Sequence, residues 1–350
     1  MGQTRTLFIA SSSQLGGAEK QLLLLLEKLK ANQTIALCIL DPSGEMNPRY
    51  QNLGITTYLS QRGPINNCLA IHQAVKDFQP DTVVNWLYKA DILGGFIAKA
   101  HRVNHIVNSA RNIKWVKFAK WKMALLVLAE KLTANHVISN SEDGKNFHIR
   151  YGYSAKKFTV IENFLDTNLI ALPKLPDQVC TIGIASRATE GKGHFEVINL
   201  LEGNPDLAKK VQLSFIGPGI PEWQPLVSRL ERSNLRYELH SYSSDLSGWF
   251  QKVDLYAALS TLSESDSSSL LDAVLTLTPI ISSPIQNFRK LSPQPPVVDP
   301  EERDELAQAL NSVLDGDIEK APELLARREN LLDTRGDEAI LAKWERILNG

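Results

Sequence analysis

The 350-residue sequence has only three cysteines and no long apolar run. Cys38, Cys68 and Cys180 are widely spaced and odd in number, which excludes a disulfide framework and predicts buried, reduced thiols in a cytoplasmic protein. No stretch of about 18 or more residues stays apolar, so we expect no membrane-spanning helix. The apolar part of the N-terminus is too short for a signal peptide.

The sequence also has no excess of charge of either sign. Lys and Arg number 38 against 39 Asp and Glu, so no global field favours nucleic acid as a partner. Neither half carries G-x-G-x-x-G after its first strand, which argues against a dehydrogenase. His101 and His105 are four residues apart, but His105 begins an apolar strand run, so we expect no metal site there.

Short apolar runs recur at the spacing of an alternating strand and helix protein. The first half contains TLFIAS, TIALCIL, ITTYL, DTVVNW, HIVNSA, HVISNS and FTVIEN, and the second contains CTIGIAS, VQLSFIG, RYELHSY, VDLYAAL, TPIISS and PPVVD. This order predicts an α/β protein with two Rossmann-like domains, whose parallel sheets face an interdomain cleft. We expect domains at 1–170 and 177–334, a linker at 171–177, and a C-terminal helix near 335–350 that packs back on the first domain.

A Ser-rich junction in the second half predicts an anion site. An apolar strand, roughly Val253 to Leu259, is followed by Glu264 and then by a helix that we expect to begin near Ser268 or Ser269. The N–H groups at such a helix start favour phosphate, and carboxylates such as Glu264 and Asp272 accept hydrogen bonds from sugar hydroxyls. A nucleotide sugar has both groups. The alternative is that Ser269 and Asp272 only form a helix-capping pair.

In each half, a glycine-containing turn follows the first strand. Arg187 and Lys192 could clamp a diphosphate at the end of a strand, and Gly191 and Gly193 favour a shaped loop around Lys192. The alternative is an exposed loop with two solvated cations. In the first half, Gly16 and Gly17 permit positive φ and close approach to a ligand, although a plain strand-to-helix turn would also explain them.

These segments stand in the order of the motifs of a known family. GGAE (Gly16 to Glu19), ISNSEDGKNFHIRYGYSAKKFTVIENFLD (Ile138 to Asp166), SRATEGKGH (Ser186 to His194), FIGPG (Phe215 to Gly219) and Glu264-x7-Asp272 together resemble the family 4 retaining glycosyltransferases, which have the two-domain GT-B fold. The resemblance covers nearly the whole chain.

The resemblance implies roles for individual residues. Arg187 and Lys192 match the cation pair on the donor diphosphate, Glu264 matches the acid near the donor sugar, and these three would form the catalytic set. Asp272 stands where the family usually has a Glu on the ribose hydroxyls. The remaining donor-binding positions are Gly16, Gly17, Gly217, Ser268, Ser269 and Leu270. Arg111 is assigned to the acceptor or phosphate side.

The implied reaction needs no metal and no other cofactor. A hexose or N-acetylhexosamine would pass from a UDP- or GDP-linked donor to a saccharide or lipid-linked acceptor with retention, in synthesis of a cell-surface polysaccharide or glycolipid. Two departures stand at the donor site: Asp272 is shorter than the usual Glu, and Asp266 adds a negative charge. A nucleotide-sugar-binding protein without turnover and a UDP-sugar epimerase remain alternatives.

The first domain also contains a segment, expected to be helical, in which basic and aromatic residues are interleaved. Residues 111–122 carry five cations interleaved with Trp115, Phe118 and Trp121. Such a segment suits peripheral contact with an anionic membrane at its cytoplasmic face, where lipid-linked acceptors reside. The alternative is a helix that covers a core and presents a solvated basic face.

Overall fold

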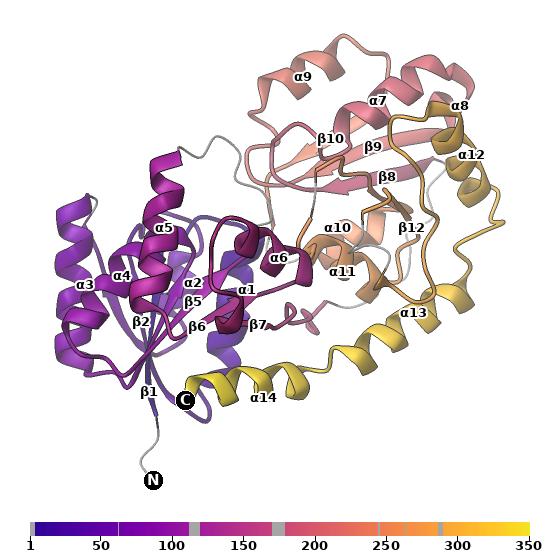
Figure 1. The fold of residues 1–350 in the computed structure, drawn as a ribbon. Coiled ribbons are helices and arrows are strands. Elements are labelled where there is room, and N and C mark those ends of the chain that lie inside the picture. The colour runs from indigo at the N-terminus through magenta and orange to yellow at the C-terminus, as the bar shows by residue number, and fades with distance from the viewer. Residues whose placement is uncertain are drawn as a thin grey trace. The chain divides into compact units, whose positions relative to one another are not determined.

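The structure is a computed structural model that describes residues 4–61, 63–111, 120–169, 179–243, 246–262, 264–285 and 290–350. The chain divides into two compact units (Figure 1). Unit 1 comprises Met1–Phe164 and Asp337–Gly350, and unit 2 comprises Leu165–Gly336. The expected linker at 171–177 lies outside the described residues.

Unit 1 contains a parallel sheet of seven described strands in the order β3-β2-β1-β4-β5-β6-β7. The strands are β1 (Arg5–Ala10), β2 (Thr34–Ile39), β3 (Thr56–Leu59), β4 (Thr82–Trp86), β5 (His105–Ala110), β6 (His136–Ser139) and β7 (Phe158–Val160). The helices are α1 (Gly17–Leu29), α2 (Asn47–Gln51), α3 (Pro64–Phe78), α4 (Tyr88–Ala100), α5 (Lys120–Thr133), α6 (Glu142–Arg150), the short 3₁₀ helix η1 (Ala155–Lys157) and α14 (Asp337–Leu348).

Alternating residues of the strands in unit 1 feed two separate cores. Leu7 and Ile9 of β1 pack with α3 and α4, whereas Phe8 of the same strand packs with α1 and α14. This alternation follows from the period of two along a strand, and it explains why β1 is apolar on both faces. In α14, Trp344 stacks on Trp86 with ring centroids 6.0 Å apart.

Unit 2 contains a second parallel sheet, with its described strands in the order β10-β9-β8-β11-β12. The strands are β8 (Cys180–Ala185), β9 (Val211–Ile216), β10 (Tyr237–His240), β11 (Leu255–Ala258) and β12 (Ile280–Ser282). The helices are α7 (His194–Gly203), α8 (Pro205–Lys210), α9 (Gln224–Glu231), α10 (Ser247–Lys252), α11 (Ser268–Leu275), α12 (Arg303–Leu314) and α13 (Ala321–Thr334).

Both sheets reverse their direction of growth once. In unit 1 the reversal falls between β1 and β4, and in unit 2 it falls between β8 and β11. The loops that leave two such strands diverge to opposite faces of the sheet, which opens a crevice at their carboxyl ends. Each unit therefore has one topologically favoured position for a ligand.

The expected strands are confirmed with one exception. The run PPVVD, at 295–299, is not a strand; only an isolated bridge joins Ser282 to Val297. Its two prolines lack the N–H groups that the hydrogen-bond ladder of a strand needs. Pro296 therefore only accepts a hydrogen bond, from the N–H of Ser282. None of the three cysteines forms a disulfide, as expected, but only Cys38 is buried, and Cys68 and Cys180 are partly exposed. Within the described residues, no helix combines the length and the apolar character needed to cross a bilayer.

Candidate functional site

The loop from β8 to α7 has the shape that its glycines predict. Gly191 and Gly193 adopt φ values of +75° and +93°, which glycine tolerates best. A Cβ atom at Gly193 would lie 2.7 Å from the Cβ of Leu259, at the end of β11. The loop around Lys192 is therefore held tightly against the segment that leaves β11.

Lys192 and Glu264 meet at the reversal point between β8 and β11. The Lys192 ammonium donates to Glu264 Oε1, although the two residues are 72 positions apart in the chain. Ser260 Oγ lies 3.1 Å from the same carboxylate oxygen and 3.0 Å from the carbonyl oxygen of Gly191. The side chains of Lys192 and Glu264 are partly buried, with 16% and 20% of their surface exposed. The fold thus brings together Lys192 and Glu264, which were predicted as site residues from two separate segments of the sequence.

Helix α11 begins at Ser268, as expected, but its cap differs from the expected one. The hydroxyl of Ser267 accepts a bond from the N–H of Leu270 at 3.4 Å, which makes Ser267 the N-cap. Ser269 is already inside the helix, so the capping pair of Ser269 with Asp272 is wrong. Asp272 is 4% exposed in the second turn of the helix.

Tyr256 is a site residue that the sequence pattern did not indicate. Its hydroxyl donates to Ser269 Oγ at 2.7 Å and so fixes the first turn of α11 to strand β11. Burial raises the pKa of Tyr256, and the charges of Glu264 and Asp272 raise it further. Both predicted carboxylates therefore act on one hydroxyl. The sequence feature that could have indicated Tyr256 is a tyrosine within a buried strand, because its O–H group needs a hydrogen-bond partner there.

Asp266 is neutralised within unit 2. Nη1 of Arg335, at the end of α13, lies 2.9 and 3.0 Å from the two carboxylate oxygens of Asp266. The side chains of Asp266 and Arg335 are 8% and 14% exposed. The negative charge that the sequence suggested would oppose an anion is therefore balanced by a cation 69 positions away.

Arg187 and Gly217 lie at the carboxyl ends of β8 and β9. The Arg187 side chain is exposed in the same loop as Lys192. Gly217 packs so closely on the Ser186 carbonyl that a Cβ atom would lie 1.8 Å from its oxygen. Because Ala188 N also donates to Pro218 O at 3.1 Å, the two loops are bound to each other. Gly217 is thus required for this close approach.

The Gly16–Gly17 turn differs from the expected one. Gly16 is the N-cap of α1 with extended backbone, at φ −169° and ψ 167°, and Gly17 begins the helix. Neither glycine adopts the positive φ that it permits, and the turn has the form of the alternative, a plain strand-to-helix turn. A Cβ atom on Gly16 would lie 2.8 Å from Glu19 Oε2, which is the end of a flexible side chain that can shift, so local packing does not by itself require a glycine here.

Arg111 of unit 1 is held by three side chains, Trp86, Ser109 and Asn163. Its guanidinium lies 4.0 Å from the ring centroid of Trp86 and donates to Ser109 Oγ at 3.0 Å and to Asn163 Oδ1 at 2.8 Å. Trp86 in turn donates from Nε1 to the carbonyl of Ala18, in the first turn of α1, at 3.0 Å. Arg111, at 7% exposure, and the Gly16–Gly17 turn are therefore linked through one tryptophan.

His194 has a packing role in unit 2. His194 begins α7 as expected, lies 3.1 Å from Ser186 Oγ, and packs edge-on against Phe215 and Trp223. Burial, with a smaller effect of Lys192, lowers the pKa of His194 to about 4. His101 contacts His72 and not His105. Across the described part of the chain, no group of three or more His, Cys, Asp or Glu has an arrangement that could hold a metal ion.

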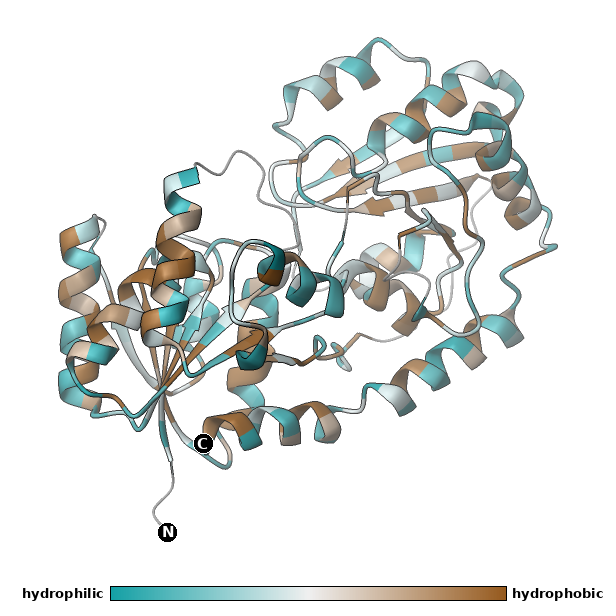
Figure 2. Ribbon diagram, viewed as in Figure 1, coloured by the Kyte–Doolittle hydropathy of each residue, from teal (hydrophilic) through white to brown (hydrophobic). Residues whose placement is uncertain are grey.

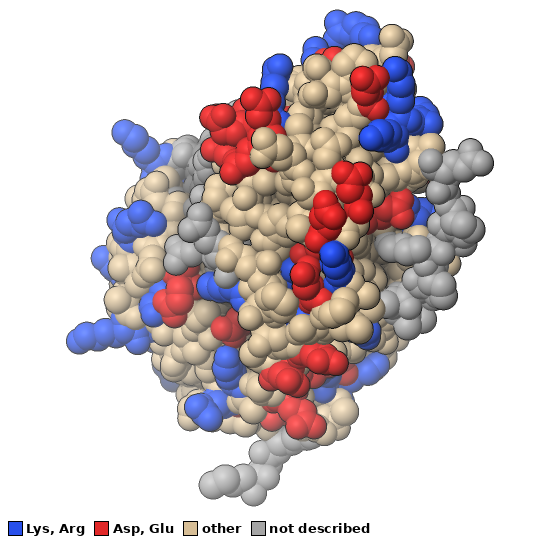
Figure 3. Space-filling model, turned by 90° about the vertical axis from the view of Figure 1, so that its right-hand side faces the viewer, with Lys and Arg blue, Asp and Glu red and all other residues tan. Residues whose placement is uncertain are grey.

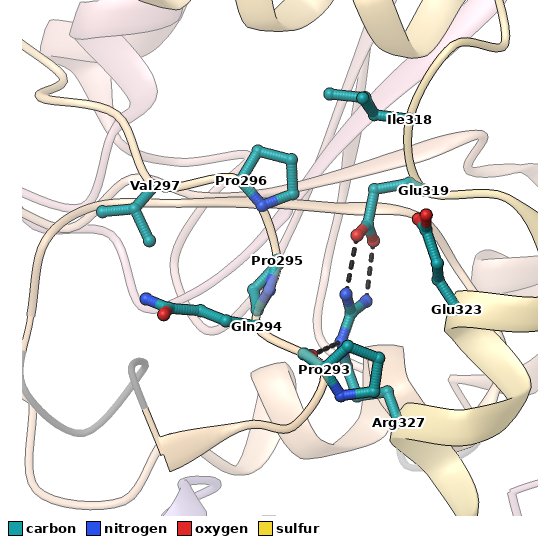
Figure 4. Close-up of a pocket in the computed structure, with 9 residues that line it drawn as sticks. All are labelled: Pro293, Gln294, Pro295, Pro296, Val297, Ile318, Glu319, Glu323 and Arg327. Carbon is teal, nitrogen blue, oxygen red and sulfur yellow. Dashed lines mark hydrogen bonds and ion pairs between the residues drawn. The ribbon is translucent and has the colours of Figure 1, made fainter.

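A pocket of about 540 Å³ lies beside the edge strand β12, away from these residues (Figure 4). Arg327 and Glu319 form a doubly hydrogen-bonded ion pair in its wall, at 2.6 and 2.7 Å, and Arg327 Nε donates to Pro293 O at 2.6 Å. The pair is almost fully buried. Because the charges satisfy each other, we interpret this wall as a clamp on the Pro-rich segment that follows β12.

Comparisons with known proteins give a family match to part of the chain and structural matches to nearly all of it. Residues 15–169 match the model of Glycosyltransferase Family 4. No curated protein matches the chain by sequence. The structure of HepE from Anabaena in complex with UDP-glucose is 19% identical, with a TM-score of 0.83, and 99% of each chain is covered.

Two further solved structures are similar over the same extent. The sucrose-phosphate synthase of Thermosynechococcus elongatus is 16% identical, with a TM-score of 0.81, and 99% of this chain and 98% of that chain are covered. A TarM mutant of S. aureus, in complex with Fondaparinux, alpha-GlcNAc-glycerol and UDP, is 11% identical, with a TM-score of 0.76, and 99% and 100% are covered. The chain therefore has the two-unit fold that these proteins share.

Proposed function

We propose that this family 4-like glycosyltransferase of the GT-B fold moves a hexose or N-acetylhexosamine from a UDP- or GDP-linked donor to a saccharide or lipid-linked acceptor, with retention at the anomeric carbon. The observation that carries the proposal is the meeting of Lys192, Glu264 and the start of α11 at the reversal point of unit 2. Similar structures hold UDP-glucose and UDP, which supports a nucleotide-linked donor.

The proposed roles follow from the chemistry of each group. The first N–H groups of α11 and the cations Arg187 and Lys192 would bind the diphosphate and offset the charge that develops on it as the sugar leaves. Glu264 would accept hydrogen bonds from the donor sugar, and Asp272 would do so from the ribose. Because the acceptor hydroxyl can pass its proton to the departing phosphate oxygen, no protein nucleophile is required.

Arg111 is proposed to act on the acceptor or phosphate side. A guanidinium fixed by Trp86, Ser109 and Asn163 loses little further entropy when it binds an anionic or hydroxyl-rich group. Replacing Arg111 by Gln should therefore lower transfer; unchanged UDP affinity would place Arg111 on the acceptor side, and weaker UDP binding would place it on the phosphate side.

The test is to incubate the purified chain with UDP-glucose, UDP-galactose, UDP-N-acetylglucosamine and GDP-mannose, and to measure thermal shift, nucleotide release and product configuration by NMR. We expect binding and slow donor hydrolysis with at least one donor, unchanged in EDTA. Binding without nucleotide release would favour the non-catalytic alternative, and conversion of the sugar on intact UDP would favour an epimerase. Absence of a shift with every donor would overturn the proposal.

Lys192→Ala tests the proposed contact of Lys192 with the donor diphosphate. Loss of one charge-assisted contact should weaken donor binding on the order of ten- to a hundredfold. Lys209→Ala removes a lysine whose side chain is 76% exposed in α8, and it should bind the donor like the wild type. Equal affinity of the two variants would refute the assignment of Lys192.

A further inference from the structure

Helix α5 turns an apolar stripe away from the core of unit 1. Trp121, Leu125, Leu128 and Leu132 follow one another at intervals of four, three and four residues, which puts them on one side of the helix. Their exposed fractions are 61%, 38%, 47% and 57%. Leu126, Ala129, Glu130 and Thr133 are the buried residues of α5. Figure 2 shows the brown of apolar residues along this helix.

The neighbouring helices add to this apolar surface. Helix α4 packs against α5 and exposes Phe96, and α3 packs against α4 and exposes Ile65 and Leu69. Of the eleven exposed large apolar side chains found among the described residues, seven belong to α3, α4 and α5. Scattered exposed apolar residues need no explanation, but a concentration on three adjacent helices indicates an interaction surface.

The exposed charges of α4 and α5 are all positive. Lys89 and Lys99 of α4 are exposed, and so are the three lysines of α5. The only carboxylates of these two helices, Asp91 and Glu130, are 1% and 0% exposed, and Glu130 is paired with Lys157. The chain as a whole is nearly neutral, and the face drawn in Figure 3 carries acidic side chains among the basic ones.

On α5 the lysines flank the apolar stripe. At about 100° per residue, Lys120 and Lys131 lie on one side of the stripe and Lys122 lies on the other. Lys122 Nζ is 5.5 Å from the ring centroid of Trp121. Long lysine side chains beside an apolar stripe can reach phosphate groups while the stripe enters the apolar layer beneath them.

We propose that the exposed faces of α4 and α5 dock on an anionic lipid bilayer, with Trp121, Leu125, Leu128 and Leu132 in the headgroup region and the five lysines on lipid phosphates. A second copy of the chain is a poorer partner for this surface, because two such faces would bring like charges together. Residues 112–119 of the basic segment predicted from the sequence lie outside the described residues, so the docking surface rests on α4 and on α5, which begins at Lys120.

The docking surface deepens the proposed function, on which it rests only for the idea that the acceptor is lipid-linked. A bilayer contact on unit 1 would bring the enzyme to a two-dimensional supply of such acceptors. Vesicle binding itself needs no donor and no catalysis, so it can be measured independently of transfer.

The experiment is flotation of the full chain with vesicles of phosphatidylcholine plus phosphatidylglycerol, and with phosphatidylcholine alone. We expect flotation with the anionic vesicles that declines with added salt. Trp121→Gln/Leu128→Gln should lose most of this binding, and each lysine-to-glutamine change at Lys122 or Lys131 should weaken it about fivefold. Leu325→Gln/Leu332→Gln, which removes exposed leucines from α13, should float like the wild type.

Failure of the wild type to float, or equal flotation of the Trp121→Gln/Leu128→Gln variant, would overturn the proposal. So would a dimer in sedimentation that the same variant dissociates, because the stripe would then be covered by a second copy. Since the changed residues are exposed, the variant should unfold no earlier than the wild type on heating. Its donor hydrolysis without vesicles should also be unchanged, so a failed transferase activity with intact flotation counts against the proposed function alone.

Discussion

Lys192 and Glu264 form a direct ion pair in which the ammonium donates to Glu264 Oε1. Each of these groups is proposed to contact a different part of the donor, and here each compensates the charge of the other. On this assignment a nucleotide diphosphate would compete with a carboxylate for Lys192.

Glu264→Gln should separate binding from turnover. Removing the carboxylate charge leaves Lys192 fully available to phosphate, so UDP affinity should rise on the order of fivefold, while transfer and donor hydrolysis fall. Calorimetric titration with UDP and nucleotide-release rates measure the two effects. Glu222→Gln makes the same chemical change at an exposed carboxylate of unit 2 and should alter neither. Weaker UDP binding by Glu264→Gln would contradict the competition.

Arg335→Met should weaken UDP binding about tenfold, because it removes the cation that lies against the largely buried carboxylate of Asp266, close in sequence to the proposed donor site. Asp266→Asn in the same chain should restore most of the affinity, since no uncompensated charge remains. If the double variant binds UDP no better than Arg335→Met, the ion pair has only a structural role. Arg232→Met, at an exposed position after α9, serves as the control.

Two buried histidines that are neutral in the folded state should lower the stability of the protein as the pH falls from about 7 to about 4, whereas buried Asp91, whose pKa burial raises, acts in the opposite direction. Burial lowers the pKa of His148 and of His194 to about 4, from 6.5. Protons therefore bind preferentially to the unfolded chain between these values, at a cost of up to about 3 kcal/mol for each histidine. Below about pH 4 both states are protonated and the loss levels off.

Urea unfolding at a series of pH values measures this slope. His194→Gln should show a smaller decrease in the free energy of unfolding between neutral and acid pH than the wild type does. His72→Gln, at an exposed position, should keep the wild-type slope. An unchanged slope in His194→Gln would mean that other groups account for the acid sensitivity.

Arg327→Met should destabilise the chain by about 3–5 kcal/mol, because it leaves the buried Glu319 carboxylate without its partner. Glu319 also accepts a bond from the N–H of Ile280 at 2.9 Å, so Glu319→Gln can keep that contact without the charge. The double variant should therefore be more stable than Arg327→Met alone. Thermal and urea unfolding of the three variants test this, and additive losses would contradict a coupled pair.

Most of the fold could be predicted because its signals are local. Runs such as TIALCIL and VQLSFIG are apolar on both faces, which is typical of a strand in a parallel sheet covered by helices. The start of α11 at Ser268 could also be predicted, because serines favour the first turn of a helix. The prolines of PPVVD disfavour a strand because they cannot donate to its hydrogen-bond ladder, and their effect was stronger than the strand preference of the valines.

The candidate site was predictable in its residue types but not in its contacts. The glycines at 191 and 193 signalled a shaped loop, and that loop is present. The glycines at 16 and 17 gave a similar signal, yet the backbone there is extended and then helical, since a glycine permits positive φ without requiring it. Tyr256 gave only a weak signal, because a strand tyrosine is usually a packing residue.

The sequence by itself determined the two parallel sheets, the helices between their strands and the types of side chain at the strand ends, because each depends on neighbours within a few residues. Only the tertiary structure decided which charges meet. The pairs Lys192–Glu264 and Asp266–Arg335, and the contact of Arg111 with Trp86, join residues far apart in the chain. Their geometry depends on the order of the strands and on the packing of the loops that leave them, and this order has no local signature.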